Sequence, residues 1–180
     1  MDIAPEVFTA DYTGQPGDRT FFLQSRSEGA TFSYLLEKQQ VAVLAEKMRE
    51  VLILVDPEDP VTAATPERDP QMALSAPIEP EWRVGTIGLA YAEDADRVVL
   101  SMHPLEDLDE QEEEEEQPAV PEPEDFAVRF VISREQTRSF VLHTLAVVSE
   151  GRPTCQLCGL PMDPAGHKCP ASNGHRLSEL

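Results

Sequence analysis

The strongest constraint on the fold is an order of local patterns that occurs twice along the chain. Each time, three runs with strand character precede one amphipathic helix. The first set has strands over 7–12, 19–26 and 30–36 and a helix over 37–54, and the second has strands over 82–91, 96–102 and 126–132 and a helix over 133–149. In the first helix, apolar residues recur at helical spacing at Val41, Leu44, Ala45, Met48, Leu52 and Val55.

These patterns predict an α+β fold, in which an antiparallel sheet carries both helices on one face. Hydrophobic residues make up 41% of the 180 residues, so the chain can build a real core. Ser133 and Gln136 have the capping-box spacing expected at the start of the second helix. The repeated order fits a duplicated βββα unit, although any two amphipathic hairpin-plus-helix segments would share the same order.

Two segments with unusual composition interrupt this α+β body, which we place at residues 1–151. Residues 56–81 contain six prolines and scattered acids, and this predicts a linker or a surface loop. Residues 104–125 predict a disordered acidic loop, because five consecutive glutamates repel one another and remain solvated. The remaining residues, 152–180, form a small C-terminal tail.

The net charge of −20 argues against two classes of partner. Twelve acidic residues lie between Glu106 and Asp125, and without them 22 acidic residues still face 14 basic ones. Nucleic-acid binding depends on Lys and Arg contacts to phosphate, so it is disfavoured, as is binding to a membrane surface. Nucleic-acid binding through the tail would require a basic patch of Arg152, Lys168 and Arg176.

Nothing in the sequence predicts export or a membrane span. The N-terminal residues lack a basic start followed by an apolar run, so no signal peptide is expected. No apolar run approaches the roughly 20 residues that a membrane-spanning helix requires. We therefore expect a cytoplasmic protein with reduced thiols.

The tail contains all three cysteines of the chain, within the stretch CQLCGLPMDPAGHKCP. Cys155 and Cys158 have the spacing of a zinc knuckle, with Gly159 just after the second thiol. A turn over 162–166 would then bring His167 and Cys169 to the same ion. Three thiolates and one imidazole would complete a closed tetrahedral site for Zn²⁺, the metal that sulfur and nitrogen ligands favour. His175 competes with His167 for the fourth position.

Such a site is expected to be structural, because protein ligands would fill every coordination position and leave none for water. The alternatives fit less well. An odd number of clustered cysteines does not make a disulfide framework, and a redox Cys-x-x-Cys pair usually begins a helix after a strand. An iron–sulfur cluster normally takes four cysteines. Chance clustering in a tail is the remaining alternative.

Outside the tail, no pattern of residues predicts a reaction. Arg129, Arg134 and Arg138 gather around the start of the second helix, where they could face an anion or form internal salt bridges. His103 lies at the end of a strand, and a lone histidine is usually a surface residue. His143 lies within the second helix, where a histidine at the edge of the core is expected. We expect Trp82 to pack on the sheet.

The two ends of the chain support a family resemblance. The opening EVFTADYTGQPGDRTFFLQSR and the closing GRPTCQLCGLPMDPAGHKCPASNGHR resemble an uncharacterised family of actinobacterial proteins, a domain of unknown function. The resemblance covers nearly the whole chain except the middle loops. It implies a bacterial cytoplasmic protein and carries over no reaction. Cys155, Cys158, His167 and Cys169 match the cysteine-rich end of that family.

Two functional hypotheses follow. The first is a non-enzymatic interaction or regulatory protein, in which a zinc-stapled tail helps to form a surface for a protein partner. The second is an enzyme that acts on a small phosphorylated or carboxylated metabolite. Its cleft would lie in the α+β body and contain Arg129, Arg134 or His103. A deep polar pocket that joins these side chains would favour the enzyme.

Overall fold

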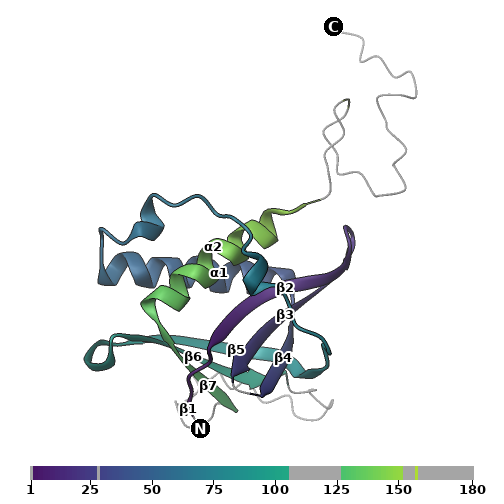
Figure 1. The fold of residues 1–180 in the computed structure, drawn as a ribbon, viewed down its shortest axis with the longest axis horizontal. Helices are drawn as coiled ribbons and strands as arrows, with labels where there is room; N and C mark the ends of the chain where they lie inside the picture. The colour runs from purple at the N-terminus through teal and green to yellow at the C-terminus, as the bar shows by residue number, and fades with distance from the viewer. Residues whose placement is uncertain (1, 28, 106–126, 152–156, 158–180) are drawn as a thin grey trace, which may run out of the picture.

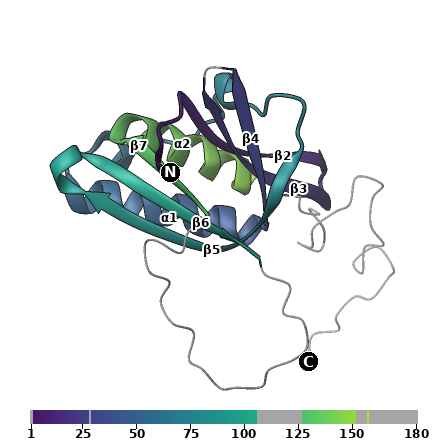
Figure 2. The ribbon, with the colours of Figure 1, turned by 90° about the horizontal axis from the view of Figure 1, so that it is seen from below.

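The computed structural model describes residues 2–27, 29–105, 127–151 and 157. Within them, a seven-stranded sheet carries two packed helices on one face, as Figures 1 and 2 show. The strands are β1 (Asp2–Ile3), β2 (Val7–Gln15), β3 (Asp18–Ser27), β4 (Ala30–Leu36), β5 (Pro80–Ala92), β6 (Arg97–Pro104) and β7 (Val128–Ser133). The helices are α1 (Lys38–Val55) and α2 (Arg134–Ser149), with 3₁₀ turns η1 (Pro60–Thr62), η2 (Pro70–Met72) and η3 (Glu93–Ala95).

The strand order in the sheet is β1-β7-β6-β5-β4-β3-β2. Two antiparallel meanders, β2-β3-β4 and β5-β6-β7, lie side by side, and each is followed in the chain by one helix. The predicted α+β class and the order βββα-βββα are therefore confirmed. Descent of the two units from a common ancestor stays a prediction.

The sheet is not wholly antiparallel, and this corrects the sequence-based expectation. β4 and β5 pair in parallel, as do β1 and β7. The first exception arises because α1 and the segment after it carry the chain back along the sheet before β5 begins. β5 therefore runs in the same direction as β4. β1 was not predicted, because a strand of two residues has no alternation of polar and apolar positions to detect.

Both helices begin at capping boxes. Ser133 and Gln136 form the predicted box at α2, in which the Ser133 hydroxyl accepts from the backbone N–H of Gln136 at 3.1 Å. Glu37 and Gln40 form the equivalent box at α1. The predicted stripe of α1 is buried at Val41, Leu44, Ala45, Met48 and Leu52. Local capping and the apolar stripe together explain why both helices start within two residues of the predicted positions.

The core lies between the sheet and the two helices. At its centre, the Phe8 ring of β2 lies 5.1 Å from the ring centroids of both Phe130 in β7 and Phe140 in α2. This contact joins the two meanders through their helix-covered face. Trp82 packs on Tyr34 with ring centroids 4.7 Å apart, so its predicted role as a sheet-packing residue is confirmed.

Residues 56–79, which we call the Pro-rich segment, pack against the body. Asp59, Val61 and Met72 are buried there. The hydroxyl of Thr9 in β2 donates to the carbonyl of Met72 at 2.6 Å, and Ser75 N–H donates to the Gln24 side chain at 2.8 Å. A surface loop was predicted because prolines and acids dominate this segment. Its anchoring depends on long-range polar contacts that composition does not reveal.

Two predicted features lie largely or wholly outside the described residues. Of the predicted acidic loop over 104–125, Pro104 ends β6, Leu105 follows it, and the remainder is not described. The four predicted zinc ligands also lie outside the described part of the chain. None of the described helices is both long enough and apolar enough to cross a membrane.

Candidate functional site

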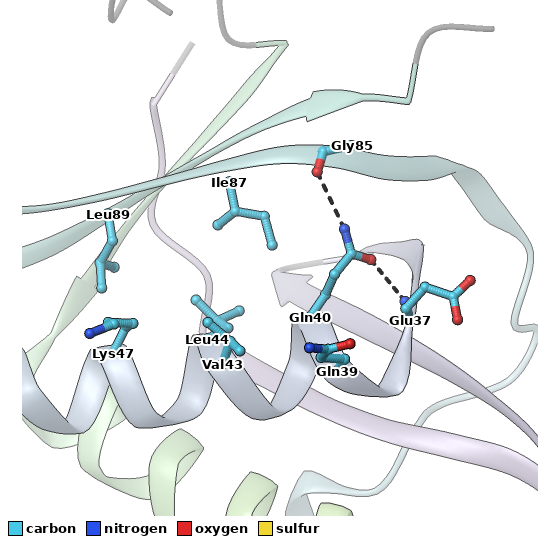
Figure 3. A pocket seen from close by; sticks show the side chains of 9 residues that line it. All are labelled: Glu37, Gln39, Gln40, Val43, Leu44, Lys47, Gly85, Ile87 and Leu89. Carbon is cyan, nitrogen blue, oxygen red and sulfur yellow. Dashed lines mark hydrogen bonds between the residues drawn. The ribbon is translucent and has the colours of Figure 1, made fainter. Parts of the chain in front are cut away.

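A hollow on the described surface lies between α1 and β5, as Figure 3 shows. It has a volume of about 520 Å³ and is mostly apolar. Its lining residues are Glu37, Gln39, Gln40, Val43, Leu44 and Lys47 from the start of α1, and Gly85, Ile87 and Leu89 from β5. Figure 3 shows Ile87 pointing from β5 toward Leu44 on the helix, and Leu89 pointing toward Lys47. We call this hollow and its extension along α1 the α1–β5 groove.

The extension is a second hollow of about 530 Å³ that shares Leu89 with the first. It is lined by Val51, Leu54 and Val55 of α1 and by Leu89, Ala90, Tyr91 and Glu93 of β5 and the following turn. The two hollows therefore follow α1 from its first turn to its last.

The helical wall of this groove combines Leu44 and Val55 of the predicted stripe with apolar side chains of α1 outside it. Val43 is 51% exposed and Leu54 is 83% exposed, although both belong to a helix that packs on a core. Large exposed apolar residues close together mark interaction surfaces more often than single scattered ones do. The sequence did contain a signal, because Val43, Val51 and Leu54 make α1 apolar on more than its core-facing side.

Several polar groups around the groove are paired within the chain. Gln40 Nε2 donates to the carbonyl oxygens of Val84 and Gly85, at 3.1 and 3.3 Å. Glu37 forms an ion pair with Arg83, and Lys47 pairs with Glu50 at 2.6 Å. The lining residues include no histidine, cysteine or serine. The groove therefore resembles a binding surface more than a catalytic cleft.

A cluster of paired charged and polar side chains lies where α2 meets β2. Arg68 of the Pro-rich segment forms ion pairs with Asp11, which is 3% exposed, and with Glu150. The Tyr12 hydroxyl donates to Glu150 at 2.5 Å, and the Arg19 guanidinium lies 4.0 Å from the centroid of the Tyr12 ring. These groups neutralise one another and tie the end of α2 to the sheet, so their present arrangement serves structure.

His143 belongs to the same region and is almost fully buried, at 1% exposure. Its Nδ1 accepts a hydrogen bond from the backbone N–H of Asp69 at 3.0 Å, and its Nε2 lies 3.8 Å from an Asp11 carboxylate oxygen. Burial lowers the pKa of His143 below its ordinary value, while Asp11 opposes this shift and Arg68 reinforces it. The ring is therefore neutral, and it joins α2 to the Pro-rich segment.

The lowered pKa of His143 predicts that stability falls with acidity. The unfolded chain binds a proton at this histidine near pH 6.5, whereas the folded chain resists it until lower pH. Below about pH 6.5, the free energy of unfolding should therefore fall by up to about 1.4 kcal/mol per pH unit because of this group, until the folded pKa is reached. Urea unfolding of the wild type and His143→Gln at several pH values measures the difference.

The His143→Gln variant should lose that part of the slope, because a glutamine side chain can accept from the Asp69 N–H without titrating. An unchanged slope in His143→Gln would contradict the prediction.

The arginines considered as anion ligands are bound to carboxylates instead. Arg129 lies 3.4 Å from Asp2, and Arg138 lies 2.8 Å from Asp59. Arg134 contacts Asp96 at 2.9 Å and Asp56 at 3.6 Å. His103 has its Nδ1 3.0 Å from the carbonyl oxygen of Pro104. None of these four side chains lines the α1–β5 groove.

The metal site stays a sequence-based prediction. Cys155, Cys158, His167 and Cys169, and the alternative ligand His175, all lie outside the described residues. Within the described ranges, no group of three or more His, Cys, Asp or Glu side chains is arranged to hold a metal ion.

Comparison with known proteins gives one match. A family model described as "Protein of unknown function (DUF3090)" matches residues 3–169, which include both meanders, both helices and the four predicted zinc ligands. No curated protein and no solved structure matches the chain.

Proposed function

The chain belongs to the DUF3090 family of proteins of unknown function. From the surface of the chain itself, we propose that it is a non-enzymatic interaction or regulatory protein. Its α+β body binds a protein partner through the α1–β5 groove. Its C-terminal segment holds a structural Zn²⁺ through Cys155, Cys158, His167 and Cys169. The thiolate ligands of such a site fit a reducing, cytoplasmic environment.

The observation that carries the proposal is the chemical character of the groove. The surface of the hollow at the start of α1 is mostly apolar, with Val43 half-exposed at its wall, although polar side chains also line it. Enzymes that act on small anions need free cationic groups in a cleft, whereas Arg129, Arg134 and Arg138 are each paired with a carboxylate. An exposed apolar groove with neutralised charges around it suits contact with another polypeptide.

Site-specific photocrosslinking tests this role in the organism that encodes the protein. A photoreactive residue at Val43 should give a covalent adduct with a protein of defined mass. The same residue at Phe32, which is 38% exposed on β4 and outside the groove, should not.

The enzyme hypothesis predicts a different result. A panel of phosphorylated and carboxylated metabolites would then include one that binds saturably by calorimetry, and Arg134→Gln would abolish that binding. This outcome, without a protein adduct at position 43, would overturn the proposed function.

A further inference from the structure

β5 has an edge that no described strand covers along most of its length. On one side it pairs with β6 as far as Ala92. On the other side it pairs with β4 only through Pro80 and Arg83, because β4 ends at Leu36. From Gly85 onward, the edge that faces away from β6 has no strand partner among the described residues. Such an edge presents N–H and C=O groups that another chain can pair with.

The start of this uncovered edge, at Gly85, faces the α1–β5 groove. Figure 3 shows the carbonyl of Gly85 directed at Gln40, whose side-chain amide donates to it and to the carbonyl of Val84. A glutamine side chain thus occupies the place where a neighbouring strand would donate. Beyond Gly85, none of the described hydrogen bonds from α1 reaches the backbone of β5.

The groove also has the length of a short strand. Residues 85–92 of β5 extend over roughly 26 Å at about 3.3 Å per residue. The 18 residues of α1 extend over about 27 Å at 1.5 Å per residue. The helix lines the groove from Glu37 to Val55, so helix and strand form two walls of similar length.

We propose that the α1–β5 groove binds an extended peptide segment of a partner protein, which adds to β5 as a neighbouring strand. This inference rests on the proposed interaction function and specifies its mode. The peptide backbone pairs with the uncovered edge of β5, and every second side chain enters the apolar space between the two walls. Val43, Leu54, Ile87 and Leu89 contact those side chains, which are therefore aliphatic.

The charge of the chain predicts the character of those peptide side chains that do not enter the apolar space. It also argues against a second copy of this chain as the occupant of the groove. The chain has a net charge of −20, so two copies repel each other, whereas a basic segment is attracted. At the start of the groove, Glu37 is paired with Arg83, and the lining cation Lys47 is paired with Glu50. The attraction of a basic segment therefore comes from Glu93 at the other end and from the net charge of the chain. The segment is therefore expected to alternate aliphatic and basic residues.

A capped heptapeptide of alternating Lys and Val, labelled with a fluorophore, is the probe. Fluorescence anisotropy with the full-length protein should show saturable binding. Val43→Arg should weaken binding by about tenfold or more, because it places a cation in the apolar wall. Phe32→Arg places the same cation outside the groove and should change affinity less than twofold. Amides of β5 beyond Gly85 should gain hydrogen-exchange protection when the probe binds.

Backbone methylation of the probe separates strand pairing from attraction by charge. In a strand, alternate residues direct their N–H groups to the same edge. One version carries N-methyl groups on three Val residues and the other on three Lys residues. Pairing through one peptide edge predicts that only one version loses binding, by about tenfold or more.

Three results would overturn this inference. Equal binding of both methylated probes would show attraction by charge alone, and the absence of binding at about 1 mM probe would exclude this peptide class. Dimerisation of the free protein that Val43→Arg abolishes would assign the groove to a second copy. In the first two cases, a partner adduct at Val43 in the crosslinking experiment would still support the interaction function. The crosslinking result therefore separates failure of the peptide-binding mode from failure of the interaction function itself.

Discussion

Replacing Arg138 with leucine should lower the free energy of unfolding by about 3 kcal/mol or more. Asp59 is fully buried, and Arg138 donates to both of its carboxylate oxygens at 2.9 and 2.8 Å. These hydrogen bonds lower the pKa of Asp59, because they favour its charged form. Without Arg138, the buried carboxylate keeps the Val61 N–H and loses its counter-charge, and removal of one partner of a buried pair costs about 3–5 kcal/mol. Urea unfolding at pH 7 measures the loss.

The matched control for this pair is the double variant Asp59→Asn/Arg138→Leu. Asparagine can still accept from Val61 N–H at the start of η1, and it carries no charge that needs a partner. The double variant should therefore be more stable than Arg138→Leu alone. A single variant that unfolds like the wild type would show that Asp59 reaches solvent or binds a proton.

Substitution of a zinc ligand should remove the metal from the protein altogether. We expect the purified wild type to contain one zinc per chain, and Cys155→Ser and His167→Ala to contain none. Structural zinc sites in small peptides contribute about 10–16 kcal/mol of binding free energy, so loss of one ligand should have a large effect. Elemental analysis measures the metal, and limited proteolysis should show faster cleavage beyond Gly151 in the variants.

His175→Ala is the control, because it removes the histidine that competes with His167. It should keep its zinc. Loss of zinc in His175→Ala but not in His167→Ala would show that His175, rather than His167, is the fourth ligand. Metal-free wild-type protein with a redox-active Cys155–Cys158 pair would contradict the zinc site itself.

Apart from β1 and the 3₁₀ turns, the strands and helices were predictable from the sequence, because each has a local cause. Alternation of polar and apolar residues marks the strands, the stripe through Val41 and Met48 marks α1, and Ser133 with Gln136 marks the start of α2. The parallel pairing of β4 with β5 was not predictable in this way. It depends on how far the chain travels between the two strands, and no local pattern records that distance.

The candidate site was less predictable than the fold. The stripe in α1 was interpreted as a single core face, although Val43 and Leu54 on the same helix face a groove. Arg134 and Arg138 lie in α2 as expected, but their partners Asp56, Asp59 and Asp96 come from distant segments. Pairing between residues far apart in the sequence requires the tertiary structure, so anion binding and internal salt bridges could not be distinguished earlier.

The parallel junction between the two meanders has a mechanical consequence. Only two residue pairs, Ser33 with Pro80 and Leu35 with Arg83, connect the half-sheets through strand pairing among the described residues. A segment added along the rest of β5 would lie in line with β4, as though β4 continued past Leu36. It would extend the strand pairing at this junction beyond the two present pairs. Occupation of the groove would thereby add strand pairing at a junction that the core contacts of Phe8 with Phe130 and Phe140 otherwise hold together.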